Sequence, residues 1–292
     1  MFNHFPYIGR NGVRVGINTS IPTSEPSQNL WTPEDDVSGQ LMWMDASDTS
    51  TITVDGNNYV TSWNDKSSNT HTFTPVSAAT GDTPPLSNFE QLNGLNTLTY
   101  EGGNSRGLSM SGDISATASD YIVIYVVDPD TVGSDVYLTD NSDIRLVTTY
   151  YTTQGNNGIG FHPNSSGSWV VSGQSTSAPQ INTFNLGNNS QSEAFLNGTS
   201  VVQGSWIQRA IITDFFIGSR TDGTSKVIDG KLGEFIIYNR TETALQQKLE
   251  GYLAHKWGLA NNLPNDHPYK NSAPTVSDSG GGFPYTFPII LS

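Results

Sequence analysis

Residues 121–128 read YIVIYVVD, a run of β-branched and aromatic side chains with no polar residue before Asp128. Apolar and polar positions do not alternate in this run, so we expect both faces of the strand to be covered by other parts of the fold. At 292 residues the chain is long enough to bury such a core without covalent staples. It contains no cysteine, which excludes disulfides and thiolate metal ligands.

Shorter β-type segments recur along the chain, with turn-forming residues between them. They read LMWMD (41–45), TITV (51–54), YVTSW (59–63), IRLVTTYY (144–151), GIGFH (158–162), SWVV (168–171), SEAFL (192–196), TSVV (199–202), DFFIG (214–218) and KLGEFIIYN (231–239). The residues at 55–58, DGNN, and at 197–198, NG, are typical of hairpin turns. Short, evenly punctuated strands predict an all-β fold, an antiparallel jelly-roll sandwich.

One helix is predicted near the C-terminal end of the sandwich. Apolar residues recur there at a spacing of three to four, which is the period of a helix face, at Leu245, Leu249, Tyr252, Leu253 and Trp257. Thr241 or Thr243 is suited to cap its start, and Gly258 to end it in the left-handed conformation. We expect this helix to pack across the end or edge of the sandwich.

The chain divides into an N-terminal arm and linker (1–40), the sandwich (41–270), and a linker with an apolar tail (271–292). The first arm carries aromatic residues and then a Pro/Ser-rich stretch, and the tail follows a Gly-rich linker. Leaving so many large apolar side chains in water is unfavourable, so both arms are predicted to be extended and to dock in assembly. The assembly residues are Phe2, Phe5, Tyr7, Phe283, Tyr285, Phe287, Ile289 and Leu291.

Several segments together resemble the concanavalin A-like, laminin-G-like jelly rolls of marine phage and bacterial proteins. They are LMWMDASDTSTITVDG, VTSWNDKSSN, LNGLNTLTYEG, GEFIIYNR, and LEGYLAHKWGL followed by LPNDHPYK. Their order and spacing cover about residues 41–270. The resemblance implies the jelly-roll fold, but this fold carries many unrelated functions.

Domains of this kind often serve as glycan-binding modules or as repeated surface elements, so we expect a non-enzymatic role. The leading hypothesis is a phage virion structural protein, a capsid decoration or fibre component. Its arms would anchor it to other virion proteins, and it would form a homo-oligomer on the virion surface. The alternative is a carbohydrate-binding or adhesion module that recognises host surface glycans. No apolar stretch near the N-terminus has the form of a signal peptide, so we expect synthesis in the host cytoplasm.

A glucanase is the third and last hypothesis. Hydrolases of this fold carry paired carboxylates on one strand, separated by about 5 Å in retaining enzymes. Glu234 is the nearest candidate, but no second carboxylate alternates with it along its segment. We therefore interpret Glu234 as a structural residue at a strand edge.

The net charge of −14 disfavours two classes of partner. A phosphate backbone would be repelled, so nucleic-acid binding is not expected. The same charge disfavours an anionic membrane, and no segment is long enough for membrane insertion.

Two small sites are predicted from residue types. No cofactor is expected except calcium, for which Asp128, Asp130 and Asp135 could supply hard oxygen ligands. The alternative is that these residues bond to backbone groups in turns, a reading we prefer for Asp45, Asp48 and Asp65 while Trp43 and Trp63 fill the core. A glycan could instead stack on an exposed indole, and Trp169 and Trp206, with Trp31, are the surface candidates.

Overall fold

A computed structural model describes most of the chain. The described residues are 29–76, 82–110, 112–115, 120–130, 136–140, 145–151, 157–162, 170–172, 177–187, 191–205, 212–213, 215–220 and 222–278. They form two large sheets and one small sheet, and every pairing between their named strands is antiparallel. No helix among them is long and apolar enough to cross a membrane.

The first sheet has eight strands. From edge to edge they are β16 (Thr199–Ser205), β15 (Gln191–Leu196), β14 (Gln180–Leu186), β9 (Tyr121–Pro129), β19 (Asp229–Tyr238), β6 (Leu95–Glu101) and β5 (Leu86–Leu92), while β1 (Gln40–Asp45) also pairs with β19. Both β1 and β6 fit beside β19 because they use different halves of that long strand. Strand β19 is therefore paired with β1 from the start of the fold and with β6 and β9 from the middle of the chain.

The second sheet has nine strands. In order they are β13 (Val170–Val171), β12 (Asn157–His162), β11 (Arg145–Tyr151), β10 (Val136–Asp140), β18 (Phe216–Ile217), β7 (Leu108–Ser109), β4 (Thr72–Pro75), β3 (Val60–Asn64) and β2 (Ile52–Val54). A small sheet pairs β8 (Asp113–Ser115) with β17 (Ile212–Thr213). Short 3-10 helices span Pro33–Asp35 (η1), Thr49–Thr51 (η2), Gly102–Asn104 (η3) and Ala260–Asn262 (η4).

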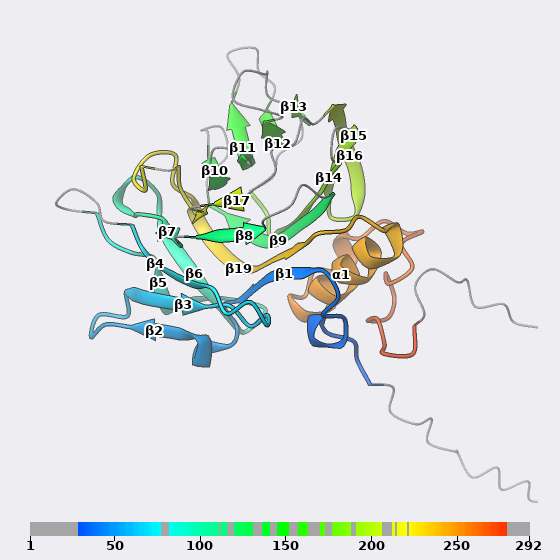
Figure 1. Cartoon of the computed structure of the whole chain (residues 1–292), viewed down its shortest axis with the longest axis horizontal. Helices are drawn as coiled ribbons and strands as arrows, with labels where there is room; N and C mark the ends of the chain where they lie inside the picture. Colours follow the sequence, from blue (N-terminus) through cyan, green and yellow to red (C-terminus); the bar gives the residue numbers. More distant parts are fainter. Residues whose placement is uncertain are drawn as a thin grey trace, which may run out of the picture.

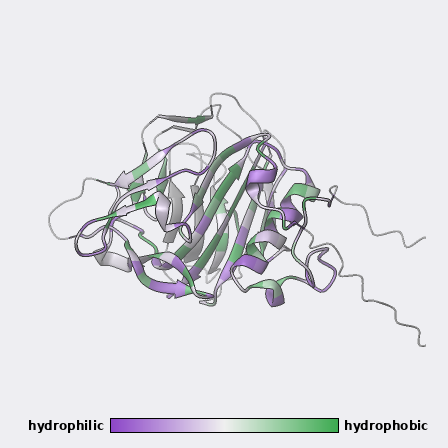
Figure 2. Ribbon diagram, turned by 90° about the horizontal axis from the view of Figure 1, so that it is seen from below, coloured by the Kyte–Doolittle hydropathy of each residue, from purple (hydrophilic) through white to green (hydrophobic). Residues whose placement is uncertain are grey.

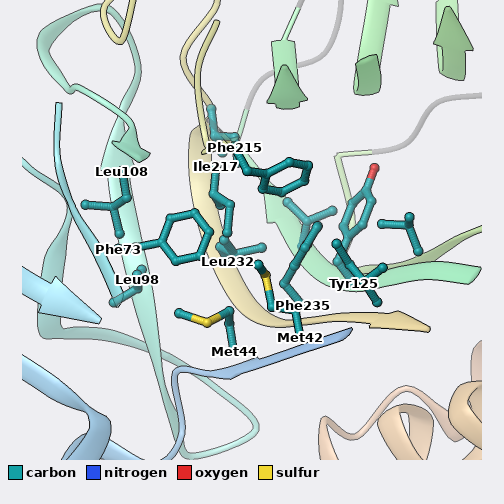
Figure 3. Close-up of a cluster of buried hydrophobic side chains, with 14 of the residues drawn as sticks. Met42, Met44, Phe73, Leu98, Leu108, Tyr125, Phe215, Ile217, Leu232 and Phe235 are labelled. Atoms are coloured by element: carbon teal, nitrogen blue, oxygen red, sulfur yellow. The ribbon is translucent and has the colours of Figure 1, made fainter. Parts of the chain in front are cut away.

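The main core lies between the two large sheets. The ring centroids of Phe73 and Phe215, both on the side of the second sheet, are 6.4 Å apart, and those of Phe215 and Phe235 of β19 are 5.8 Å apart (Figure 3). Tyr125 stacks on Phe235 at 6.2 Å. Ring pairs at these separations add to the stability gained from burial. Figure 2 shows the apolar residues concentrated on the strands of this interior.

Strand β9 is buried on both faces, as predicted. Tyr121, Val123, Tyr125 and Val127 belong to the core between the sheets. Their neighbours Ile122, Ile124 and Val126 belong to a second core on the opposite face of the first sheet. The uninterrupted apolar run is therefore explained by two cores that share one strand.

Helix α1 (Thr243–Lys256) covers that second face. All five residues of its predicted apolar stripe are buried there, and Gly258 ends it with φ +73°. The expected position at the end or edge of the sandwich is wrong, because the helix packs on the face of the sheet beside β1 and β19 (Figure 1). The expected threonine cap is also wrong, since the N-cap is Glu242 and its side chain makes no capping bond.

Both predicted hairpin turns are confirmed. Strands β2 and β3 pair across 55–58, where Asp55 Oδ1 accepts hydrogen bonds from the backbone of Asn57 and Tyr59. Strands β15 and β16 pair across Asn197 and Gly198, which have φ values of +51° and +78°. The predicted antiparallel jelly-roll sandwich with one C-terminal helix is therefore confirmed, while the arms before residue 29 and after residue 278 lie outside the described residues.

Candidate functional site

A buried carboxylate, Glu234, lies at the junction of β1, β19 and α1. Its side chain is fully buried, and Oε1 accepts hydrogen bonds from Trp43 Nε1 at 2.6 Å and Tyr252 Oη at 3.0 Å. Oε2 accepts from Lys256 Nζ at 2.7 Å and Trp257 Nε1 at 2.9 Å. The expected place at a strand edge is wrong, because β19 is paired on both sides of this residue.

A second carboxylate stands opposite the first, on the neighbouring strand. Asp45 of β1 is the registered partner of Glu234, and Lys256 Nζ lies 2.8 Å from Asp45 Oδ1. Lys66 Nζ lies 3.3 Å from Asp45 Oδ2 and 3.0 Å from Asp48 Oδ2. Acidic and basic groups therefore alternate from the buried end at Glu234 to the half-exposed end at Asp48, and we call these five residues the ionic chain.

The pKa values of the two buried carboxyls move in opposite directions. Burial raises the pKa of Glu234, as does the charge of Asp45, while Lys256 and Trp257 oppose the rise. Burial also opposes ionisation of Asp45, but Lys256, Ser47 and Lys66 together hold the pKa of Asp45 below its ordinary value. Since four donors occupy both oxygens of Glu234, neither oxygen is free to attack a sugar or to protonate a leaving group.

Several segments that carry the family resemblance have structural roles in the same region. Asp65 Oδ1 accepts hydrogen bonds from the backbone of Trp43 and Ser67, each at 2.8 Å. Asp45 and Asp48 bond in the same way to the backbone of nearby serines. Trp43 and Trp63 are almost fully buried. The preferred structural interpretation of these segments is therefore confirmed.

The two described residues of the predicted calcium site contact a lysine. Lys231 Nζ of β19 lies 2.9 Å from Asp128 Oδ2 and 3.7 Å from Asp130 Oδ1. Among the residues the structure describes, no group of three acidic or histidine side chains is placed to hold a metal ion. Asp135 lies outside them, so the calcium site stays a prediction.

This lysine is the centre of a polar surface on the outer face of the first sheet. Glu90 Oε2 of β5 lies 3.8 Å from Lys231 Nζ. Next to Glu90, Phe89 is 62% exposed in a bulge of this edge strand, where Asn88 has φ +61°. We call the group the Lys231 surface, and its members are Glu90, Thr99, Asp128, Asp130 and Lys231.

Thr99 is the buried member of the Lys231 surface. On β6 it alternates with Leu98 and Tyr100, which face the core between the sheets, so Thr99 faces outward. It is the registered partner of Lys231 on β19 and is only 4% exposed. Its hydroxyl has no hydrogen-bond partner. A buried hydroxyl left in this state is unfavourable, which marks the position as one where a further group would bond.

Trp31 was expected on the surface, but the structure buries it. It is 3% exposed and packs edge-on against Tyr252 of α1, with ring centroids 6.1 Å apart. Its backbone N–H donates to Pro274 O at 2.9 Å, and Leu30 pairs with Thr275. Packing therefore continues past residues 41–270 on both sides, and the points where the two arms join the described fold are adjacent.

The remaining predicted site residues cannot be placed. Asp135, Trp169, Trp206 and the eight predicted assembly residues, Phe2, Phe5, Tyr7, Phe283, Tyr285, Phe287, Ile289 and Leu291, lie outside the described residues. Sequence reasoning named two members of the Lys231 surface, Asp128 and Asp130, as calcium ligands. It missed Glu90, Thr99 and Lys231, because these residues come from three other strands.

Comparison with known proteins gives only distant structural likeness. No protein-family model matches the chain, and no curated protein matches it in sequence. Domain 4 of AbnA, a GH43 extracellular arabinanase from Geobacillus stearothermophilus in complex with arabinotriose, is 16% identical, with 68% of this chain and 92% of that chain covered and a TM-score of 0.48. The binding domain of paraclostridial mosquitocidal protein 1 is 13% identical, with 73% and 51% covered and a TM-score of 0.47.

The botulinum neurotoxin serotype D binding domain is 10% identical, with 70% of this chain and 49% of that chain covered and a TM-score of 0.45. This chain thus spans about half the length of the two toxin chains. At these identities and TM-scores the likeness carries no argument about ligand or reaction. The resemblance to phage virion proteins has no counterpart among these structures.

Proposed function

We propose that this chain is a non-enzymatic carbohydrate-binding module and that the Lys231 surface contacts the glycan. The observation that carries this proposal is the cluster of charged side chains around Lys231, with the exposed ring of Phe89 next to Glu90 in the chain. An aromatic face accepts the apolar C–H face of a sugar ring, while charged groups form strong hydrogen bonds with its hydroxyls.

The ionic chain supports a binding role over hydrolysis. A glycosidase needs one carboxyl that can give up a proton and one that is free to act as nucleophile or base. Here Asp45 and Glu234 are both engaged by Lys256, and the tryptophan and tyrosine donors fill what remains of Glu234. The arrangement of Asp45, Glu234 and Lys256 instead fixes the helix to the sheet.

The proposal is tested with the full-length chain on a glycan array, followed by titration of any bound oligosaccharide. Phe89→Ala should weaken binding about tenfold, which corresponds to about 1.4 kcal/mol. Its fold should be unaffected, because the ring is mostly in solvent. Leu30→Ala is the matched control, since Leu30 is 64% exposed at a different place. An array without signal, or equal binding by Phe89→Ala and wild type, would overturn the proposal.

Display on a phage particle is the second candidate function. The adjacent junctions of the two arms favour it, because Val276 N donates to Asn29 O at 2.9 Å and one attachment point could hold both arms. Deleting residues 279–292 removes the apolar tail and keeps the Leu30–Thr275 pairing. The truncated chain should fold normally but fail to join a particle. Normal incorporation of the truncated chain would rule out anchoring by the tail.

A further inference from the structure

The Lys231 surface has more acidic than basic groups. Asp128, Asp130 and Glu90 all point toward the single ammonium of Lys231. Asp128 forms the closest ion pair with Lys231, at 2.9 Å, and its side chain is only 16% exposed. One lysine cannot neutralise three carboxylates, so the surface keeps an excess of negative charge.

Two of these carboxylates are open to a ligand. The side chains of Asp130 and Glu90 are 51% and 39% exposed, and their oxygens lie beyond hydrogen-bonding distance from Lys231, at 3.7 and 3.8 Å. They flank the ammonium from the residue that follows β9 and from β5. A cationic group of a ligand can therefore contact them without displacing Lys231 from Asp128.

A further observation indicates that this is a place for a ligand. The hydroxyl of Thr99, buried next to Lys231, lacks a hydrogen-bond partner. A ligand hydroxyl could reach it after a small movement of the flexible lysine stem. A hydroxyl-bonding group and anionic groups thus occur together, and the exposed ring of Phe89 is the next residue in the chain from Glu90.

We propose that the Lys231 surface selects glycans that carry free amino groups, with Asp130 and Glu90 as the carboxylates that pair with the sugar ammonium. This inference rests on the proposed carbohydrate-binding function. The net charge of −14 acts in the same direction, because it attracts cationic ligands and repels glycans rich in carboxylate or sulfate.

The test compares three hexasaccharides with the full-length chain: β-1,4-linked glucosamine, its N-acetylated form, and galacturonate. The first two share backbone and linkage but differ in charge. The glucosamine hexamer should bind at least about fivefold more tightly than the acetylated one, as expected for one or two exposed ion pairs. This preference should shrink in 0.5 M salt, because charges more than ~5 Å apart are then largely screened. The galacturonate hexamer should not bind.

Variants separate the site from general attraction to an acidic protein. Asp130→Asn and Glu90→Gln should each reduce the preference for the amino sugar. Asp266→Asn, the control, removes the same charge from an exposed position elsewhere and should leave the preference unchanged. Equal binding of the amino and acetylated hexamers, equal effects of all three variants, or binding of galacturonate would overturn the amino-sugar inference alone. Failure of every glycan on the array would overturn the proposed function as well.

Discussion

Asp45 of β1 and Glu234 of β19 lie opposite each other, and the single ammonium of Lys256 is within 2.8 Å of the first and 2.7 Å of the second. Lys256 is the last residue of α1. The helix is therefore fixed to the sheet at its C-terminal end by one cation shared between two strands. The adjacent residue, Trp257, adds its own bond to Glu234.

Replacing that cation should destabilise the fold strongly. Lys256→Met keeps most of the apolar stem but leaves two buried carboxylates facing each other. Removing one partner of a buried ion pair typically costs 3–5 kcal/mol, and we expect about 3 kcal/mol here because the lysine is partly exposed. Urea unfolding followed by tryptophan fluorescence measures the loss.

The control is Lys270→Met, because the hydrogen bonds of Lys270 within the described residues go to two backbone carbonyls, those of Asn261 and Leu263. It should cost about 2 kcal/mol, with about 1 kcal/mol for each hydrogen bond. If the two variants lost equal stability, the bridge between the carboxylates would have no special role.

The two carboxyls should act on stability in different pH ranges. The folded pKa of Asp45 is lowered, so its stabilisation is present above its ordinary value of 3.8 and is lost as pH falls through the folded pKa. The folded pKa of Glu234 is raised above its ordinary value of 4.5. Between pH 4.5 and the raised folded pKa of Glu234, the folded state holds more protons than the unfolded state. The free energy of unfolding therefore falls as pH rises through this range.

Unfolding free energies of wild type, Asp45→Asn and Glu234→Gln, measured from pH 3 to 8, check both signs. The slope is compared and not the level, because each amide also disturbs hydrogen bonds at every pH. Asp45→Asn should flatten the acid side of the curve. Glu234→Gln should remove a decline above pH 4.5. A steeper decline in Glu234→Gln would contradict the assigned direction.

Trp31 should contribute to stability although it lies outside the predicted sandwich. Its ring is buried against Tyr252, and Lys248 Nζ lies 5.1 Å from the ring centroid. Trp31→Ala should cost about 3 kcal/mol, the lower end of the range for a buried tryptophan. Val37→Ala, at an exposed position nearby in sequence, should cost less than about 0.5 kcal/mol. Equal thermal midpoints for the two variants would show that the segment before residue 40 does not stabilise the fold.

The calcium prediction can be tested through the lysine between Asp128 and Asp130. Its ammonium occupies the position that a cation would share with these carboxylates. Lys231→Met should therefore bind calcium more tightly than wild type, visible as a larger rise of the thermal midpoint with added calcium. Equal responses of the two proteins would indicate that Asp128 and Asp130 are not ligands.

The sequence predicted those features that depend on local pattern. The uninterrupted run of β9 predicted burial on both faces, and the spacing of Leu245, Leu249 and Leu253 predicted the buried face of α1. Hairpins were predicted because Asn-Gly and Asp-Gly turns encode a backbone shape directly. In each case the residues responsible are close together in the chain.

The features that were missed depend on pairing between distant strands. Glu234 was assigned to a strand edge because only its own segment was considered, while its partner Asp45 comes from the start of the sandwich. The helix was placed at an edge because an apolar stripe shows that a face is covered but not which one. The burial of Trp31 was missed because the segment that bonds to its backbone, at Pro274, comes from the far end of the chain.

The pairing of Leu30 with Thr275 has a mechanical consequence. A pull applied at residues 29 and 278 would load this short antiparallel pair first, and from the end at which both strands leave it. Its hydrogen bonds would break one after another, at low force, and not all together. The two sheets would carry tension only after Trp31 had been drawn away from Tyr252. The junction would thus yield before the sandwich does, so a tethered domain could absorb a brief load and re-form without unfolding.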